Sequence, residues 1–199
     1  ALAGVEVKNS ILLVDFTNDG KKDIFTSAGI PKRLNDLDFL EFAHKDSMRY
    51  SESLDPVQIK RILENLPDGR ARNRMFENQG DFRFEDRSVK WGLDEAGYSN
   101  GAIYADLDND GVLDVATNNF YGPVSLFKNQ IQEQAPGHHF ISVRLKGDDA
   151  NTHGLGAKVF IKTTDGFQTL QATPTHGFLS SMQGPLHFGV GSNTTIDSL

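Results

Sequence analysis

One short segment of the chain carries carboxylates at alternate positions, a pattern suited to binding a cation. Residues 106–114 read Asp-Leu-Asp-Asn-Asp-Gly-Val-Leu-Asp. Alternate side chains of a tight loop point toward a common centre, where Ca²⁺ takes about six to eight oxygen ligands. Gly111 supplies the positive φ that such a loop needs. The expected calcium ligands are the carboxylates of Asp106, Asp108, Asp110 and Asp114 and the backbone carbonyl of Val112.

A weaker copy of this segment lies near the start of the chain. Residues 15–23 read Asp-Phe-Thr-Asn-Asp-Gly-Lys-Lys-Asp, so a threonine takes the place of one carboxylate. The corresponding ligands are Asp15, Thr17, Asp19, the backbone carbonyl of Lys21, and Asp23. With fewer carboxylates, this loop is expected to bind calcium more weakly than residues 106–114.

Calcium at either loop is expected to be structural, because it would hold a hairpin together without performing chemistry. Clustered carboxylates repel one another, so bound metal should stabilise the fold. The alternative is that both loops are solvated acidic turns that bind no metal. That alternative is stronger for residues 15–23.

Strands are expected on both sides of each loop. Apolar and β-branched residues occupy 11–14 and 102–105 before the loops, and 24–26 and 115–117 after them. An EF-hand is excluded, because it needs flanking helices and a bidentate glutamate at its twelfth position. Threonine stands at that position in both copies.

The rest of the chain divides into a helical insertion and further strands. The insertion is expected at about residues 34–66, with one helix beginning at Pro56 after an Asp55 cap and ending at Pro67. A hairpin is expected from strands 74–77 and 82–85. The break at 134–137 separates two domains, 1–133 and 138–199. Strands expected in the second domain are 140–145, 157–161, 167–172 and 186–191, and glycines in the last indicate close backbone approach.

Two known families share these motifs. The acidic loop 106–114 followed by Phe-Lys-Asn-Gln at 127–130, with 76–86 as outer blade strands, resembles the FG-GAP or VCBS repeat of calcium-binding β-propellers. The C-terminal part resembles the ASPIC/UnbV domain, and both occur together in proteins similar to cartilage acidic protein. The residues that carry this second resemblance are 139–147, 151–159, 177–181 and 186–191.

The resemblance implies a mainly-β protein. We expect partial calcium-binding propeller blades, with a helical insertion, followed by a β-sandwich-like ASPIC/UnbV domain. The insertion at 32–39 resembles large exported proteins of Bacteroidetes-type bacteria, which implies an extracellular, cell-surface or periplasmic location. Residues 196–199 read as the middle of a strand, so we expect a truncated piece of a longer protein.

Composition narrows the classes of function. The chain has 199 residues, a formal net charge of −7 and no cysteine. This acidic balance disfavours a nucleic-acid partner, which normally meets a basic surface. No apolar run is long enough to span a membrane.

Other residues give weaker indications. Ser180 or Ser181 with His176 and Asp165 would be a possible catalytic triad, but a nucleophile elbow is missing. Trp91 is expected to pack between blades, with sugar stacking as the alternative. Exposed aromatic contacts are expected at the turn 120–123, near Tyr98 and Tyr104. The five C-terminal histidines lack the spacing of a zinc motif.

We therefore expect a non-catalytic, extracellular, calcium-binding interaction module whose partner is a glycan or a cell-surface protein. One alternative is part of a polysaccharide-acting enzyme whose active site lies outside this chain. The other is a structural spacer. The residues that would bind the partner are unknown from the sequence.

Overall fold

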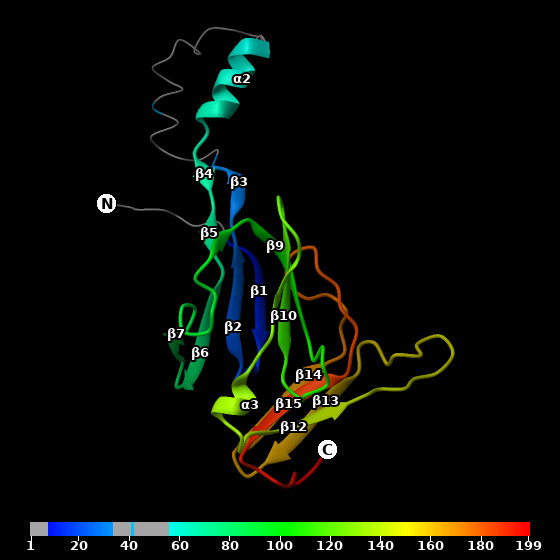
Figure 1. Ribbon diagram of the computed structural model, residues 1–199. Coiled ribbons are helices and arrows are strands. Elements are labelled where there is room, and N and C mark those ends of the chain that lie inside the picture. Colours follow the sequence, from blue (N-terminus) through cyan, green and yellow to red (C-terminus); the bar gives the residue numbers. More distant parts are fainter. Residues whose placement is uncertain (1–7, 34–40, 42–55) are drawn as a thin grey trace.

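The computed structural model describes residues 8–33, 41 and 56–199, and most of its elements are strands (Figure 1). The first sheet holds four antiparallel strands in the order β1-β2-β6-β7. They are β1 (Lys8–Val14), β2 (Asp23–Ala28), β6 (Arg74–Gly80) and β7 (Arg83–Asp86). The acidic loop after β1 leads directly into β2, which confirms the expected strand–loop–strand unit.

The hairpin expected after the helix is β6–β7, and its turn lies later than the sequence suggested. The expected turn is 78–81, whereas the positive φ values fall on Gly80, Asp81 and Phe82, at 85°, 49° and 56°. The side-chain oxygen of Asn78 accepts the N–H of Gly80 at 2.9 Å, where the pairing register shifts. This local bond bends β6 without ending it, so the strand continues to Gly80.

The second sheet repeats the inner part of the first. It contains three antiparallel strands in the order β11-β10-β9. These are β9 (Ser99–Ala105), β10 (Asp114–Asn119) and β11 (Ser125–Phe127). The second acidic loop joins β9 to β10, as the first joins β1 to β2. The two loops therefore occupy equivalent places in two similar sheets.

The main hydrophobic core fills the space between these two sheets. In β1, Leu12 and Val14 are buried, whereas Ile11 and Leu13 are 57% and 60% exposed. Phe25 of β2 is fully buried, and Val115 of β10 meets it from the other sheet. Alternation along β1 thus turns one face toward the partner sheet and leaves the other open to solvent.

The helical insertion stands away from the sheets on a narrow ribbon (Figure 1). Its helix α2 (Pro56–Asn65) begins and ends as the sequence predicts. The cap Asp55 and residues 34–40 and 42–54 of the expected insertion lie outside the described residues. Short strands complete this region: β3 (Ile30–Lys32) pairs with β4 (Asp68–Gly69), and β5 (Ala71–Arg72) pairs with β8 (Ala96–Gly97).

The C-terminal part is built from two short antiparallel pairs. Strand β12 (His139–Val143) pairs with β15 (Leu186–Gly191), and β13 (Lys158–Thr163) pairs with β14 (Gly166–Gln171). Both pairs pack around a small core of Ile161, Phe188 and Val190. The short helix α3 (Ile131–Gln134) ends at the expected domain break. The described residues contain no helix long and apolar enough to cross a membrane.

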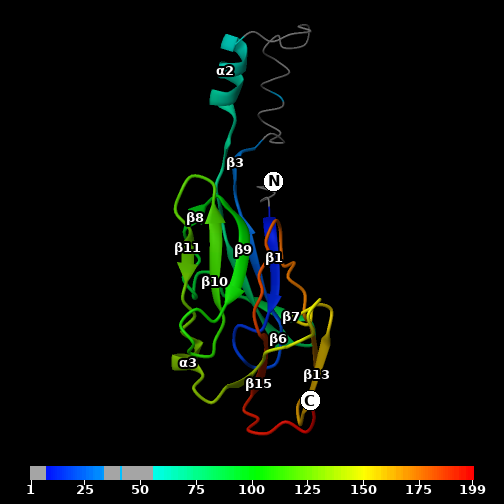
Figure 2. The same cartoon turned by 90° about the vertical axis from the view of Figure 1, so that its right-hand side faces the viewer.

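The C-terminal strands dock on the end of the first acidic loop. The N–H of Gly191 donates to the carbonyl of Asn18 at 2.8 Å. A Cβ on Gly189 would lie 2.0 Å from Oδ2 of Asp15, so β15 touches this loop directly. The segment between β14 and β15 runs back beside β1 and β9 (Figure 2), where the N–H of Phe178 donates to Oγ of Ser10 at 3.1 Å.

Replacing Gly189 tests this docking. In Gly189→Ala the new methyl group would meet Asp15 and the backbone of Asn18, 2.5 Å away. We expect a loss of about 2 kcal/mol in the free energy of unfolding, as for other overpacked sites. Urea denaturation measures it. Gly184→Ala is the matched control, because a Cβ there meets nothing within 4 Å. Equal stability of the two variants would contradict the docked arrangement.

Candidate metal centre at the acidic loops

Three carboxylates of the second acidic loop converge. Asp106, Asp108 and Asp110 each offer one oxygen, and these oxygens lie within 4.8 Å of one another. Asp106 is half-buried and the other two are exposed. Oxygens at this spacing can share a hard cation, which brings its remaining ligands from backbone and water.

Backbone N–H groups hold the loop in this shape. The carboxylate of Asp106 accepts the N–H groups of Asp110 and Gly111, both at 3.1 Å. Asp110 in turn accepts the N–H of Val112 at 3.1 Å. Asn109 and Gly111 have φ values of 61° and 88°, which turn these N–H groups inward. The carboxylates are thus positioned by the loop itself.

Asp114 lies apart from the converging cluster. It is 3% exposed, and its two oxygens accept the N–H of Leu107 at 3.1 Å and that of Asn129 at 2.8 Å. The sequence predicts Asp114 as the ligand that closes the shell. In the structure its carboxylate also ties the start of the loop to the segment after β11, and its role as a ligand stays a prediction. The side chain of Val112 is buried at the loop's base.

The first loop repeats this hydrogen-bond pattern. Asp15 accepts the N–H of Asp19 at 3.2 Å and that of Gly20 at 2.8 Å. Asp23 accepts the N–H of Phe16 at 3.0 Å and that of Asn78 at 2.9 Å. The two loops therefore share one conformation, with the first and last aspartates braced by backbone in both.

The remaining predicted ligands of the first loop are placed differently. Asp19 accepts the N–H of Lys21 at 2.8 Å and also the ammonium of the same lysine at 2.7 Å. The hydroxyl of Thr17 donates to Asp15 at 3.4 Å. In the part of the chain that the structure describes, the first loop offers no third acidic or histidine donor that converges with the others.

Burial separates the two loops. Asp15 is 7% exposed because Gly189 of β15 packs against it, whereas its counterpart Asp106 is half-buried. Asp23 and its counterpart Asp114 are both buried, at 0% and 3% exposed. Desolvation raises the pKa of Asp15 to about 6 and that of Asp23 to about 7. The second loop faces solvent, and a hydrogen bond from Lys128 lowers the pKa of Asp108.

Lys128 places a cation on the second loop. Its ammonium lies 2.5 Å from Oδ2 of Asp108 and 3.9 Å from Oδ2 of Asp110. The hydrogen bond to Asp108 raises the pKa of Lys128, so this side chain stays protonated. A metal ion that binds Oδ2 of Asp108 has to displace the lysine from that oxygen. Lys128 is therefore a tethered competitor for the site.

Two asparagines that the sequence did not single out also hold the acidic loops in place. Asn78 and Asn129 hold the last aspartate of each loop through their backbone N–H groups. The Nδ2 of Asn129 also donates to the carbonyls of Phe16 and Leu113, so it connects the two loops. The signal was the repeated Phe-x-Asn-Gln at 76–79 and 127–130.

The possible catalytic triad is not assembled. Oγ of Ser180 donates to the carbonyl of Phe178, and a ring nitrogen of His176 pairs with the carbonyl of Thr173. Asp165 accepts the side chain of Asn193. Each group therefore serves the local structure of its own loop.

The histidines and aromatic residues take separate places. His138 pairs with the carbonyl of Thr17 at 2.8 Å, in the first acidic loop. Phe120 and Tyr121 are exposed, as the sequence predicts for this turn, and the Tyr121 ring contacts Tyr98 edge-on. Tyr104 instead contacts the ring of His176.

Comparison with known proteins identifies the C-terminal part. Residues 147–199 match the family described as ASPIC and UnbV. This part is an ASPIC/UnbV domain. The match begins before β13, while β12 precedes it and pairs with β15 inside it. A comparison with curated proteins found no match. The docking on the first acidic loop is thus made by an ASPIC/UnbV strand.

The half-buried His187 makes this docking sensitive to pH. Its Nε2 pairs with Oδ1 of Asn18 at 2.7 Å, its ring stacks on Phe140, and desolvation lowers its pKa to about 4. Between pH 6.5 and 4 the unfolded chain binds a proton here that the folded chain does not. Stability contributed by the neutral ring is therefore lost as pH falls through this window.

His187→Gln should remove this pH dependence, because glutamine does not titrate. We expect wild type to lose about 1 kcal/mol relative to His187→Gln between pH 7.5 and pH 5. Urea denaturation of both chains at each pH measures the difference. The raised pKa values of Asp15 and Asp23 have the opposite effect, because they stabilise the folded state as pH falls. Both chains carry these aspartates, so their effect cancels when the unfolding free energy of one chain is subtracted from that of the other. A difference that does not change with pH would refute the assignment.

Proposed function

We propose that this chain is a calcium-binding, non-catalytic interaction module. The convergence of Asp106, Asp108 and Asp110 supports it, because the loop holds three hard oxygen donors together before any cation binds. Calcium would bind these carboxylates, the carbonyl of Val112 and the carboxylate of Asp114. It would neutralise charges that otherwise repel, and so hold β9 against β10.

The first loop is the weaker site of this proposal. Its ligand set would be Asp15, Thr17, Asp19, the carbonyl of Lys21, and Asp23. Burial under β15 and the loss of one carboxylate both favour a docking role over tight metal binding. The raised pKa values of Asp15 and Asp23 support this, since their ionised forms are poorly solvated.

The two sheets are proposed as consecutive FG-GAP/VCBS blades of a β-propeller. They pack face to face, and their loops are equivalent in position and hydrogen bonding. Each sheet also leaves an apolar outer face: Ile11 and Leu13 are exposed on β1, and Leu126 is 67% exposed on β11. Neighbouring blades would cover such faces.

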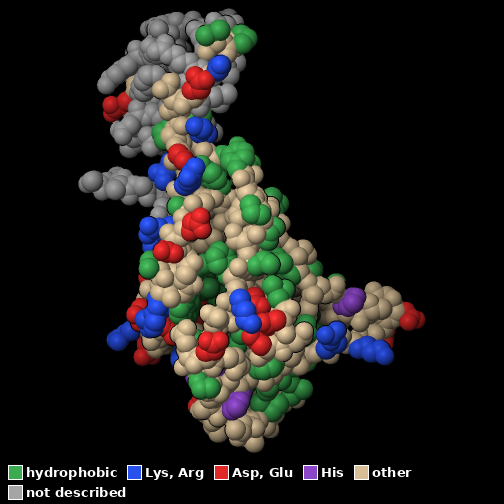
Figure 3. All heavy atoms as spheres, in the orientation of Figure 1, with side chains coloured by type: hydrophobic (Ala, Val, Ile, Leu, Met, Phe, Trp, Pro, Cys, Tyr) green, Lys and Arg blue, Asp and Glu red, His purple; other side chains and the backbone are tan. Residues whose placement is uncertain are grey.

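A glycan or a cell-surface protein remains the proposed partner, in an extracellular or periplasmic setting. Hydrophobic side chains lie open on the surface of the two-sheet part (Figure 3). Phe120 and Tyr121 are 54% and 76% exposed there, at the end of β10. Exposed aromatic rings can stack on sugars or anchor a protein interface.

Melting temperature tests the calcium site. Adding millimolar calcium to chelator-treated protein should raise it by about 5 °C, through mass action on the folded state. Asp108→Asn should remove most of this rise, because it deletes one converging carboxylate. Asp149→Asn, an exposed acid outside both loops, is the matched control and should respond like wild type. If calcium raised the melting temperature of Asp108→Asn as much as that of wild type, the assignment of the calcium site to this loop would be refuted.

A further inference from the structure

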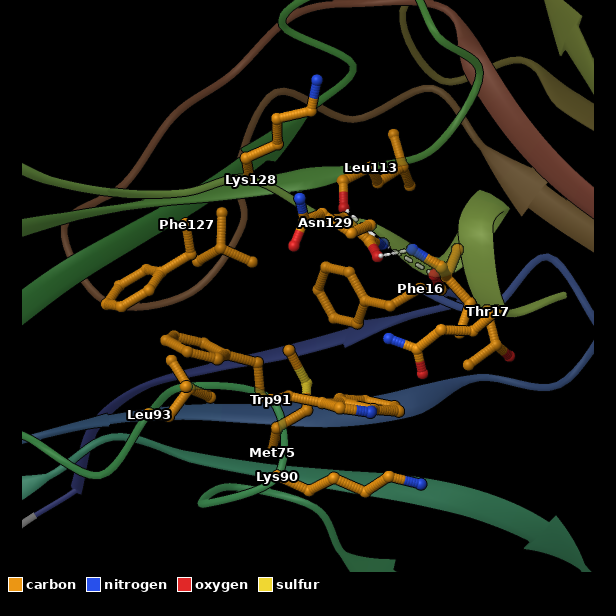
Figure 4. Close-up of a pocket in the computed structure, with 16 residues that line it drawn as sticks. Phe16, Thr17, Met75, Lys90, Trp91, Leu93, Leu113, Phe127, Lys128 and Asn129 are labelled. Atoms are coloured by element: carbon orange, nitrogen blue, oxygen red, sulfur yellow. Dashed lines mark hydrogen bonds between the residues drawn. The ribbon is translucent and has the colours of Figure 1, made fainter.

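A pocket of about 310 Å³ opens between the two blade sheets, beside α3 (Figure 4). Rings from three segments form its walls: Phe16 follows β1, Trp91 lies between β7 and β8, and Phe127 ends β11. The volume is at the low end for small-molecule sites. It suits a ligand with one ring and a short substituent.

The charge of the lining is opposite to that of the chain. The net charge of the protein is −7, yet the residues that line this pocket include two lysines and no carboxylate. Lys90 is exposed at the rim, and among the described residues it forms no ion pair. The amides of Asn129, Gln130 and Gln134 complete the polar part.

We propose that this pocket binds a small aromatic carboxylate, with its ring between Trp91, Phe16 and Phe127 and its anion on Lys90. The apolar walls remove the ring from water, and the ammonium group pairs with the carboxylate. A cationic ligand would meet only positive charge at the rim, and a neutral one would leave Lys90 without a partner.

Lys128 connects this pocket to the second acidic loop. Lys128 is one of the residues at the pocket, while its side chain turns away, with its ammonium on Asp108 (Figure 4). A calcium ion on Asp108 and Asp110 would displace that ammonium. The freed lysine then adds a second positive charge near the pocket, so calcium raises affinity for the anion. This second step rests on the proposed calcium site, whereas ligand binding to Lys90 does not.

The single tryptophan of the chain is Trp91, so its fluorescence reports on the pocket directly. The probe is 3-phenylpropanoate, and 3-phenylpropanamide is its neutral counterpart. In chelator, the carboxylate should change the fluorescence saturably and bind about tenfold more tightly than the amide. No saturable change, or equal binding of the two probes, overturns the proposal.

Surface lysine variants separate the pocket from general charge effects. Lys90→Met should weaken 3-phenylpropanoate binding about tenfold in chelator. Lys146→Met, which replaces an exposed lysine that follows β12, should leave it unchanged. Equal weakening in both variants would show a non-specific charge effect and overturn the assignment of the anion to Lys90.

Calcium titration tests the link through Lys128. In wild type, saturating calcium should tighten probe binding about threefold or more, whereas Lys128→Met should bind equally with and without calcium. The link is refuted if calcium raises the melting temperature of wild type but does not change its affinity for 3-phenylpropanoate. A melting temperature that does not respond to calcium contradicts the proposed function, and the chelator measurements still decide the pocket.

Discussion

The structure depends on two buried carboxylates that each accept two backbone N–H groups. Asp23 connects the first loop to β6, and Asp114 connects the second loop to the segment after β11. Buried N–H groups without partners would cost about 1–3 kcal/mol each. Each aspartate therefore holds together its own strand, the start of its loop and a third segment, which is β6 for Asp23 and the segment after β11 for Asp114. These hydrogen bonds keep the acidic loops in their shape.

The same loop serves two purposes in one chain. The first copy is covered by β15 and contacts the C-terminal part directly. The second copy faces solvent and keeps its carboxylates accessible. Lys128 takes part in both the loop and the neighbouring pocket. Burial, more than the residues themselves, distinguishes the copies.

Local features could be predicted from the sequence, and long-range contacts could not. The strands around both loops, the helix from Pro56 and the β6–β7 hairpin follow from periodicity and turn residues. The glycines of β15 indicated close backbone approach, and Gly189 meets Asn18. The sequence could not tell that the first loop is the partner of β15, because this contact joins residues far apart in the chain. The hydrogen bond that Asp114 accepts from the distant Asn129 is another such long-range contact.

The ribbon that carries α2 has an evolutionary consequence. The N–H of Arg33 and the carbonyl of Pro67 are 3.0 Å apart, so the inserted arm leaves and rejoins the rest of the fold at one point. Its length can change at little entropic cost and without moving either sheet. Descendants of one ancestral chain can therefore gain, lose or exchange this arm. A mutation in an acidic loop has a larger effect, because the loop packs against its own sheet and against the C-terminal strands.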